Sequence, residues 1–171
     1  IVGNADLIKK VYVPKYIYPL TRIMSSLINM LISLIPLAAV AIFSGLLPNK
    51  TYFLLPFPLL CLALFCLGLG MLLASAMVFF RDIQFLWGVL ITIWTYLTPI
   101  FYPVSALPDS VQVIVKMNPL YFYVTFLRSC VMDGLSPEPI MYVQCALIAL
   151  VMLAVGAFTF KKSQDNFVLY L

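Results

Sequence analysis

The sequence predicts an all-α membrane protein: a polytopic bundle of four transmembrane helices, with one short helix before them and two short helices on the outer face. Hydrophobic residues make up 64% of the 171 residues and charged residues only 9%, whereas soluble domains carry about 25% charged residues. The charges are also unevenly placed, because four stretches carry none: residues 23–49, 51–80, 83–108 and 139–160. About 20 apolar residues cross a bilayer core as a helix, and each stretch is long enough.

Residues 4–15 predict a short helix rather than a crossing. Leu7, Ile8 and Val11 share one apolar face of a helix, and Pro14 ends it. Basic residues flank this face, so the segment also fits an amphipathic helix lying on a lipid surface. Because the chain starts without methionine, we expect it to be a piece of a longer protein.

Four helices are predicted to cross the membrane, and their residue ranges are 21–47, 52–80, 84–102 and 140–160. Pro36 predicts a kink in the first, and Pro99 and Pro103 bend or end the third. The second carries small residues that let another helix approach closely. These are Gly68, Gly70, Ala74, Ser75 and Ala76.

Residues 109–132 predict two short helices, at about 109–117 and 119–132, that lie in or dip into the membrane face. Their apolar run, residues 117–127, is too short to cross. Asn118 and Pro119 form a good helix start, with Asn as the cap and Pro at the first helical position. Asp133 and Gly134 form a good stop.

The basic residues predict the orientation of the bundle. Four crossings place both ends of the chain on one side, and that side collects seven of the ten basic residues: Lys9, Lys10, Lys15, Arg22, Arg81, Lys161 and Lys162. The other side holds Lys50, Lys116 and Arg128. Basic residues favour the cytoplasmic side, so we expect both ends in the cytoplasm and the two short helices outside.

The residue types argue against several kinds of chemistry. The sequence has no histidine and its six acidic residues are scattered, so no general acid–base or nucleophile–base set can be assembled. The four cysteines form no CxxC pair, so neither a metal site nor a cofactor is expected. No nucleic-acid partner is expected either, since the basic residues follow the membrane pattern. No Walker A pattern occurs, and no ionisable residue lies at mid-membrane depth; any transport would draw its energy from a partner.

Two groups of residues leave both a structural and a functional interpretation open. Arg81 and Asp82 form either a plain cytoplasmic turn or a contact with a partner. Aromatic side chains of the third span either anchor the helix at the interface or line a path for sugar rings. The candidates for that path are Trp94, Tyr96, Phe101 and Tyr102.

Four motifs in the same order resemble those of ABC-2 type permeases. Residues 4–15 (NADLIKKVYVPK) resemble the family's N-x-x-LI-x-K-V-x-x-P segment, and residues 80–83 (FRDI) resemble its cytoplasmic turn. Residues 98–103 (TPIFYP) resemble its T/S-P-I-x-Y motif. Asn118-Pro119 followed by Arg128 resembles its outer N-P…R segment. The resemblance covers essentially the whole chain.

The resemblance implies the membrane subunit of an ABC exporter in the bacterial cytoplasmic membrane. The cargo would be a lipid-linked polysaccharide such as O-antigen, teichoic acid or a capsule-like glycan. ATP would be hydrolysed on a separate ATPase chain, and two permease copies would form a homodimer. Family members have six membrane helices, and the four predicted here match the last four.

The resemblance also implies roles for particular residues. Residues 4–15 would be the coupling helix that docks on the ATPase, through Asp6, Leu7, Lys9, Lys10, Val13 and Pro14. The two short helices would form the outer gate, through Asn118, Pro119, Tyr121 and Arg128. Two alternatives stay open: an ABC-2 permease that exports a drug or a small lipid, and a membrane scaffold that transports nothing.

Overall fold

The computed structural model describes residues 17–43, 50–80 and 82–163, and within them every element is helical. The predicted all-α fold class is therefore confirmed. The predicted coupling helix at 4–15 lies outside the described residues, as does Arg81. The elements in chain order are α2 (Ile17–Phe43), η2 (Lys50–Leu54), α3 (Pro56–Phe79), α4 (Ile83–Leu97), η3 (Val104–Ala106), α5 (Asp109–Met117), α6 (Pro119–Arg128), η4 (Ser129–Asp133) and α7 (Pro139–Ser163).

In the part of the chain that the structure describes, three helices are long and apolar enough to span a membrane: α2, α3 and α7. They contain 27, 24 and 25 residues, which at about 1.5 Å per residue exceed the ~30 Å of a bilayer core. Pro36 lies inside α2, which is one continuous helix. Prolines are tolerated in membrane helices because the freed backbone groups find other partners.

Helix α4 is shorter than the crossing predicted for residues 84–102, because it ends at Leu97 after 15 residues. Thr98 has an extended backbone (φ −84°, ψ 124°). This conformation is expected since Pro99 follows, and a residue before proline is disfavoured in a helix. The sequence up to residue 102 is apolar but not helical, so hydrophobicity alone overestimated the length of this helix.

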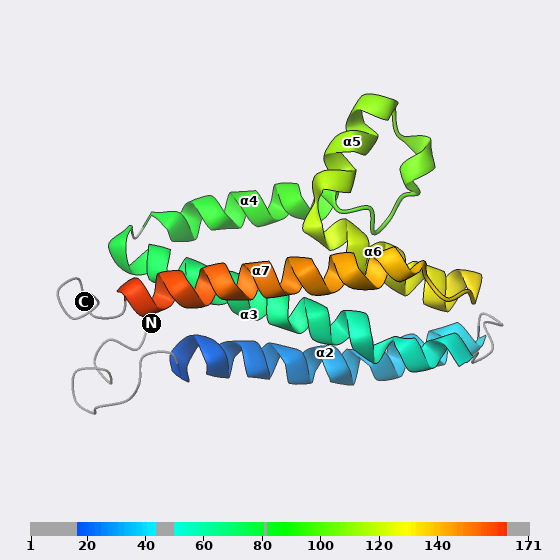
Figure 1. Ribbon diagram of the computed structural model, residues 1–171, viewed down its shortest axis with the longest axis horizontal. Coiled ribbons are helices and arrows are strands. Elements are labelled where there is room, and N and C mark those ends of the chain that lie inside the picture. The colour runs from blue at the N-terminus through cyan, green and yellow to red at the C-terminus, as the bar shows by residue number, and fades with distance from the viewer. Residues whose placement is uncertain (1–16, 44–49, 81, 164–171) are drawn as a thin grey trace.

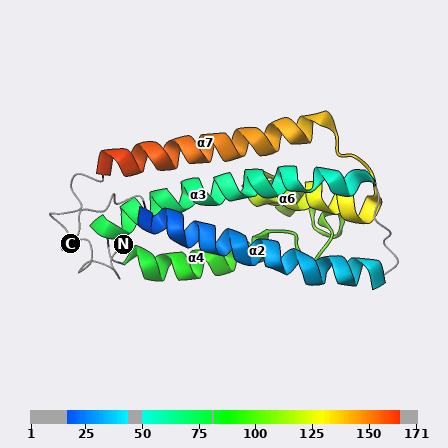
Figure 2. The ribbon, with the colours of Figure 1, turned by 90° about the horizontal axis from the view of Figure 1, so that it is seen from below.

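The helices pack side by side, with α2, α3 and α7 forming the bundle and α4 lying along it (Figures 1 and 2). The first turn of α2, the last turn of α3, the start of α4 and the last turn of α7 lie at one end of the bundle (Figure 1). The elements η2 and η4 lie at the other end, where they contact each other. Helix α5 projects away from the bundle, whereas α6 runs alongside α3 and α7.

Helices α3 and α7 form the tightest contact in the described bundle. Gly156 of α7 lies directly against Gly68 of α3: a Cβ atom added to Gly156 would overlap the carbonyl oxygen of Gly68 and lie 2.6 Å from its carbonyl carbon. The prediction that small residues of the second span allow close approach is thus confirmed at Gly68. Backbone contact of this kind is what packs helices in a lipid environment.

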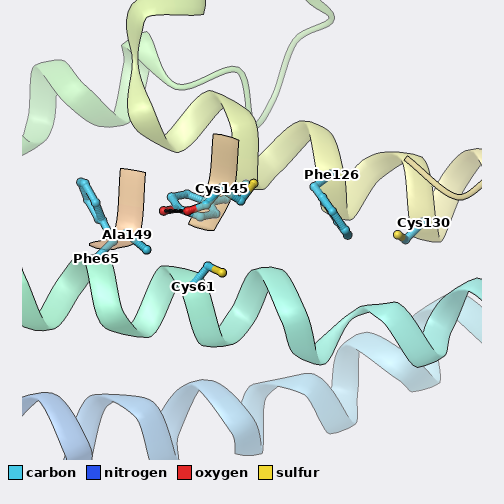
Figure 3. Close-up of a cluster of buried hydrophobic side chains, with 7 residues drawn as sticks. Cys61, Phe65, Phe126, Cys130, Cys145 and Ala149 are labelled. Atoms are coloured by element: carbon cyan, nitrogen blue, oxygen red, sulfur yellow. Dashed lines mark hydrogen bonds between the residues drawn. The ribbon is translucent and has the colours of Figure 1, made fainter. Parts of the chain in front are cut away.

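A cluster of buried side chains joins α6 and η4 to this pair (Figure 3). Its members are Cys61 and Phe65 of α3, Tyr123 and Phe126 of α6, Cys130 of η4, and Cys145 and Ala149 of α7. The hydroxyl of Tyr123 donates a hydrogen bond to the carbonyl oxygen of Cys145 at 3.1 Å. Helix α6 is therefore part of the bundle core rather than a helix resting on its surface.

The start of α6 and the end of η4, which continues from it, follow the predicted signals. The side chain of Asn118 accepts a hydrogen bond from the backbone N–H of Leu120, and Pro119 occupies the first helical position. At the other end, the π-helical turn η4 stops at Gly134, whose left-handed backbone (φ 63°) suits glycine. Both predictions, the cap and the stop, are confirmed.

Candidate functional site

The candidate site is the junction where the end of α4 meets the start of α6. Its centre is the side chain of Asn118, which is only 4% exposed. The indole N–H of Trp94 donates to Asn118 Oδ1 at 2.7 Å, and the backbone N–H of Leu120 donates to the same oxygen at 3.0 Å. Asn118 Nδ2 donates to the Thr98 hydroxyl at 2.9 Å. One amide side chain thus binds the last turn of α4, the residue that follows α4, and the first turn of α6.

Thr98 completes this network from the α4 side. It is 2% exposed, and its hydroxyl donates to the carbonyl oxygen of Trp94 at 2.8 Å while it accepts from Asn118. A threonine hydroxyl has one donor and two acceptor sites, so its donor is fully used. A buried polar group without a partner is costly. These three side chains therefore fix one another's positions.

A second connection between the same segments comes from Arg128, at the last residue of α6. Its Nη2 donates to the carbonyl oxygen of Pro99 at 3.0 Å and approaches that of Ile100 at 3.4 Å. Residues 98–100 carry the T/S-P-I motif, and they are bonded to both ends of α6, through Asn118 and Arg128. The motif residues that lie far apart in the sequence meet here in space.

The four aromatic candidates for a glycan path do not share one role. Trp94 is half-buried and its indole N–H is bonded to Asn118. Tyr96 and Phe101 are 75% and 86% exposed. Tyr102 is half-buried, and its hydroxyl donates to the carbonyl oxygen of Tyr96 at 2.8 Å. Two of the four rings are therefore available on the surface, whereas Trp94 is bonded to the side chain of Asn118 and Tyr102 to the backbone of Tyr96.

An apolar groove of about 390 Å³ lies between α4 and the α5–α6 corner. Asn118 is its only hydrogen-bonding side chain apart from the indole of Trp94, and these two groups are bonded to each other. The remaining lining residues are Leu90, Ile93, Leu97, Ile114, Met117 and Pro119. The groove offers apolar surface and few free polar groups.

The other predicted site residues lie elsewhere. Asp82 precedes α4 as its cap and is exposed, and its side chain makes no capping bond. Tyr121 is half-buried, with its ring edge-on to that of Phe122. Residues 6–14 of the predicted coupling helix, like Arg81, lie outside the described residues. Among the described residues, no group of three or more His, Cys, Asp or Glu side chains could hold a metal ion.

Sequence reasoning did not single out two threonines that bond distant segments. Thr98 was recognised only as part of a motif, and Thr51 of η2, whose hydroxyl donates to the carbonyl oxygen of Cys130 in η4 at 3.1 Å, was not noted. A hydroxyl at the edge of a long apolar stretch needs a partner. The need for a hydrogen-bond partner could therefore have drawn attention to both threonines, although it does not say where the partner lies.

This geometry defines a multi-pass membrane protein in which one short helix, α6, packs against the longer helices α3 and α7. The sequence matches the family described as ABC-2 type transporter over residues 7–132. The chain therefore belongs to the ABC-2 type transporter family, which consists of membrane transport proteins.

Several curated proteins that are similar to this chain share one name. A Myxococcus xanthus protein named O-antigen export system permease protein RfbA is 26% identical over 98% of this chain and 65% of its own length. Two Klebsiella pneumoniae proteins of the same name are 26% and 28% identical, over 90% and 78% of this chain and 61% and 52% of their own lengths. The chain thus spans between about half and two thirds of the length of these relatives.

Proposed function

We propose that the chain is part of the permease subunit of an ABC exporter that moves a lipid-linked polysaccharide across the bacterial cytoplasmic membrane. The observation that carries this proposal is the match along 98% of the chain to a protein named as an O-antigen export permease. O-antigen is therefore the first cargo to test, ahead of teichoic acid and capsule-like glycans.

In this proposal a separate ATPase chain supplies the energy. It would dock on residues 4–15, through Asp6, Leu7, Lys9, Lys10, Val13 and Pro14, and the cytoplasmic turn at Arg81 and Asp82 would be a second place of contact. The end of the bundle that carries Arg22, Lys161 and Lys162 is then cytoplasmic, in keeping with the preference of basic residues for that side. Both ends of this chain segment face the cytoplasm, and the permease works as a homodimer.

The opposite end of the bundle would face outward, and α5 and α6 would form its gate. Asn118, Pro119 and Arg128 support this role, because they fix where α6 starts and how it attaches to α4. The exposed rings of Tyr96 and Phe101 would meet the glycan, and Trp94 and Tyr102 would hold that segment in place. Tyr121 lies on the same gate helix.

The proposal is tested by co-purification of the full-length protein in mild detergent. An ATPase with a P-loop should accompany the tagged protein at equal stoichiometry. The variant Lys9→Glu with Lys10→Glu should lose most of that ATPase, because it replaces two positive charges of the proposed docking surface by negative ones. The matched variant Lys161→Glu with Lys162→Glu changes the net charge by the same amount in the last turn of α7 and should keep the ATPase.

The cargo is tested by depletion of the protein in its source cells. Loss of long glycan from the cell surface, with lipid-linked glycan accumulating inside, is the expected result. Normal surface glycan together with altered drug or lipid export would assign the protein to the alternative cargo. If no ATPase copurifies under conditions that preserve known ABC complexes, the exporter proposal is wrong and the scaffold interpretation takes its place.

A further inference from the structure

Helix α6 is hydrogen-bonded at both of its ends to the same short segment, residues 98–100. At its start, Asn118 Nδ2 donates to the hydroxyl of Thr98 at 2.9 Å. At its end, Arg128 Nη2 donates to the carbonyl oxygen of Pro99 at 3.0 Å. This segment continues directly from α4, whose last turn is also bonded to Asn118 through the indole of Trp94 at 2.7 Å. Hydrogen bonds thus join α4, residues 98–100 and α6 to one another.

The bond between Asn118 and Thr98 is buried, and the bonds that Trp94 and Arg128 make beside it are partly buried. Asn118, Thr98 and Pro99 are all buried, and the groove beside Asn118 is lined almost entirely by apolar side chains. Without competing water, a polar side chain that loses its protein partner stays unsatisfied. Small displacements of α4 relative to α6 are therefore opposed, and the two helices are expected to shift together.

Helix α5 is connected differently. It packs mainly on η3 and on α6, its neighbours along the chain, and it projects from the bundle (Figure 1). Of its nine residues only Val115 is buried. The chain passes from α5 to α6 at Met117 and Asn118, so Asn118 is where the loosely held helix meets the firmly held one.

We infer that Asn118 is a positioning residue of the transport step: it makes α4, residues 98–100 and α6 move as one body, so that displacement of α4 is carried into the core of the bundle. The inference rests on the proposed function, since it needs a transport cycle that moves α4. The start of α4 lies at the end of the bundle where the ATPase is proposed to dock, and α6 reaches the opposite end. Asn118 would thus transmit motion between the two ends.

The test uses the full-length permease with its ATPase in proteoliposomes, and fluorescently labelled lipid-linked O-antigen as the probe. Transport and ATP hydrolysis are measured together, and their ratio is the readout. Asn118→Ala removes three side-chain bonds and should lower glycan moved per ATP about tenfold, whereas Thr98→Val removes two and should lower it about threefold. A purely structural defect would lower the yield of complex and leave this ratio unchanged.

Thr95→Val is the matched control for Thr98→Val. The Thr95 hydroxyl also donates to a carbonyl oxygen one turn back, that of Ile91 at 2.7 Å, but it is exposed and has no bond to α6. The amount of glycan that Thr95→Val moves per ATP should stay within about twofold of the wild-type value, since exposed local bonds contribute little. The double variant Thr98→Val with Asn118→Ala should be no worse than Asn118→Ala alone, because both remove the same link.

Wild-type ratios in both Asn118→Ala and Thr98→Val would overturn the inference and leave the proposed function standing. Additive losses in the double variant would also overturn it. If Asn118→Ala fails to assemble, the milder Thr98→Val variant decides the question alone. A wild-type complex that hydrolyses ATP but moves no glycan would overturn the proposed function, and this inference with it.

Discussion

The α3–α7 pair and the α4–α6 junction are held together by opposite means. Between α3 and α7 the contact is apolar and so close that Gly156 and Gly68 touch through their backbones. Between α4 and α6 the contact is a polar network in which Asn118 bonds to Trp94, Thr98 and Leu120. The α3–α7 contact depends on the shape of the two helices, whereas the α4–α6 junction depends on the pairing of hydrogen-bond donors with acceptors.

The difference indicates that the α3–α7 pair is the rigid part of the molecule and that the α4–α6 junction is the part that can move. Backbone contact between two helices tolerates almost no displacement, because any added atom or tilt meets main-chain atoms. A hydrogen-bonded junction fixes orientation while it leaves the helices free to shift as a unit. Helix α4 has no buried residue, so its attachment to the described part of the chain depends mainly on this junction.

The largest effect is expected from substitutions at the α3–α7 contact. Gly156→Ala places a Cβ atom onto the carbonyl group of Gly68, and overpacking of this kind costs about 1–3 kcal/mol. We expect a clear loss of folded protein when the full-length permease is titrated with a denaturing detergent. The free energy of unfolding is the quantity to compare.

Gly88→Ala is the matched control for that experiment. A Cβ atom at Gly88 in α4 meets nothing within 4 Å, and alanine favours a helix over glycine by up to about 1 kcal/mol. This variant should be as stable as the wild type or slightly more so. If the two alanine variants were equally destabilised, the close contact would not be the feature that holds α3 and α7 together.

A smaller effect is expected at the α4–α6 junction. Arg128→Gln removes the charged donor from the carbonyl oxygens of Pro99 and Ile100, and interhelical hydrogen bonds in membranes contribute about 0.6 to 1.7 kcal/mol. Hydrogen exchange in residues 98–102 should become faster, while α3 and α7 keep their protection. Lys116→Gln removes a cation from the exposed surface of α5 and should leave both regions unchanged. Faster exchange that spread equally to α3 and α7 would mean that the two regions are not independent.

The sequence predicted these two regions unequally well. The close approach at Gly68 followed from the composition of the second span. The start of α6 followed from Asn118 and Pro119 and the end of η4 from Gly134, since small residues, caps and stops act locally. The end of α4 at Leu97 was overestimated because residues 98–102 are apolar although Pro99 prevents a helix there. The aromatic composition of the third span left Trp94 either as an interface anchor or as part of a glycan path, and it gave no sign that the indole N–H would bond to Asn118. A bond between residues more than twenty positions apart leaves no periodic signal in a single sequence.

The smallest effect is expected at the far end of the bundle, where one bond ties η2 to η4. The Thr51 hydroxyl donates to the carbonyl oxygen of Cys130 at 3.1 Å, and Cys130 lies in the π-helical turn η4. Thr51→Val keeps the shape of the side chain and removes the donor, so a loss of about 0.6 kcal/mol in unfolding free energy is expected. Thr92→Val is the control, because the Thr92 hydroxyl bonds only one turn back along α4, to Gly88. A larger loss of unfolding free energy for Thr51→Val than for Arg128→Gln would contradict the expected order. The contact between η2 and η4, rather than the α4–α6 junction, would then be the main polar attachment of the short helices.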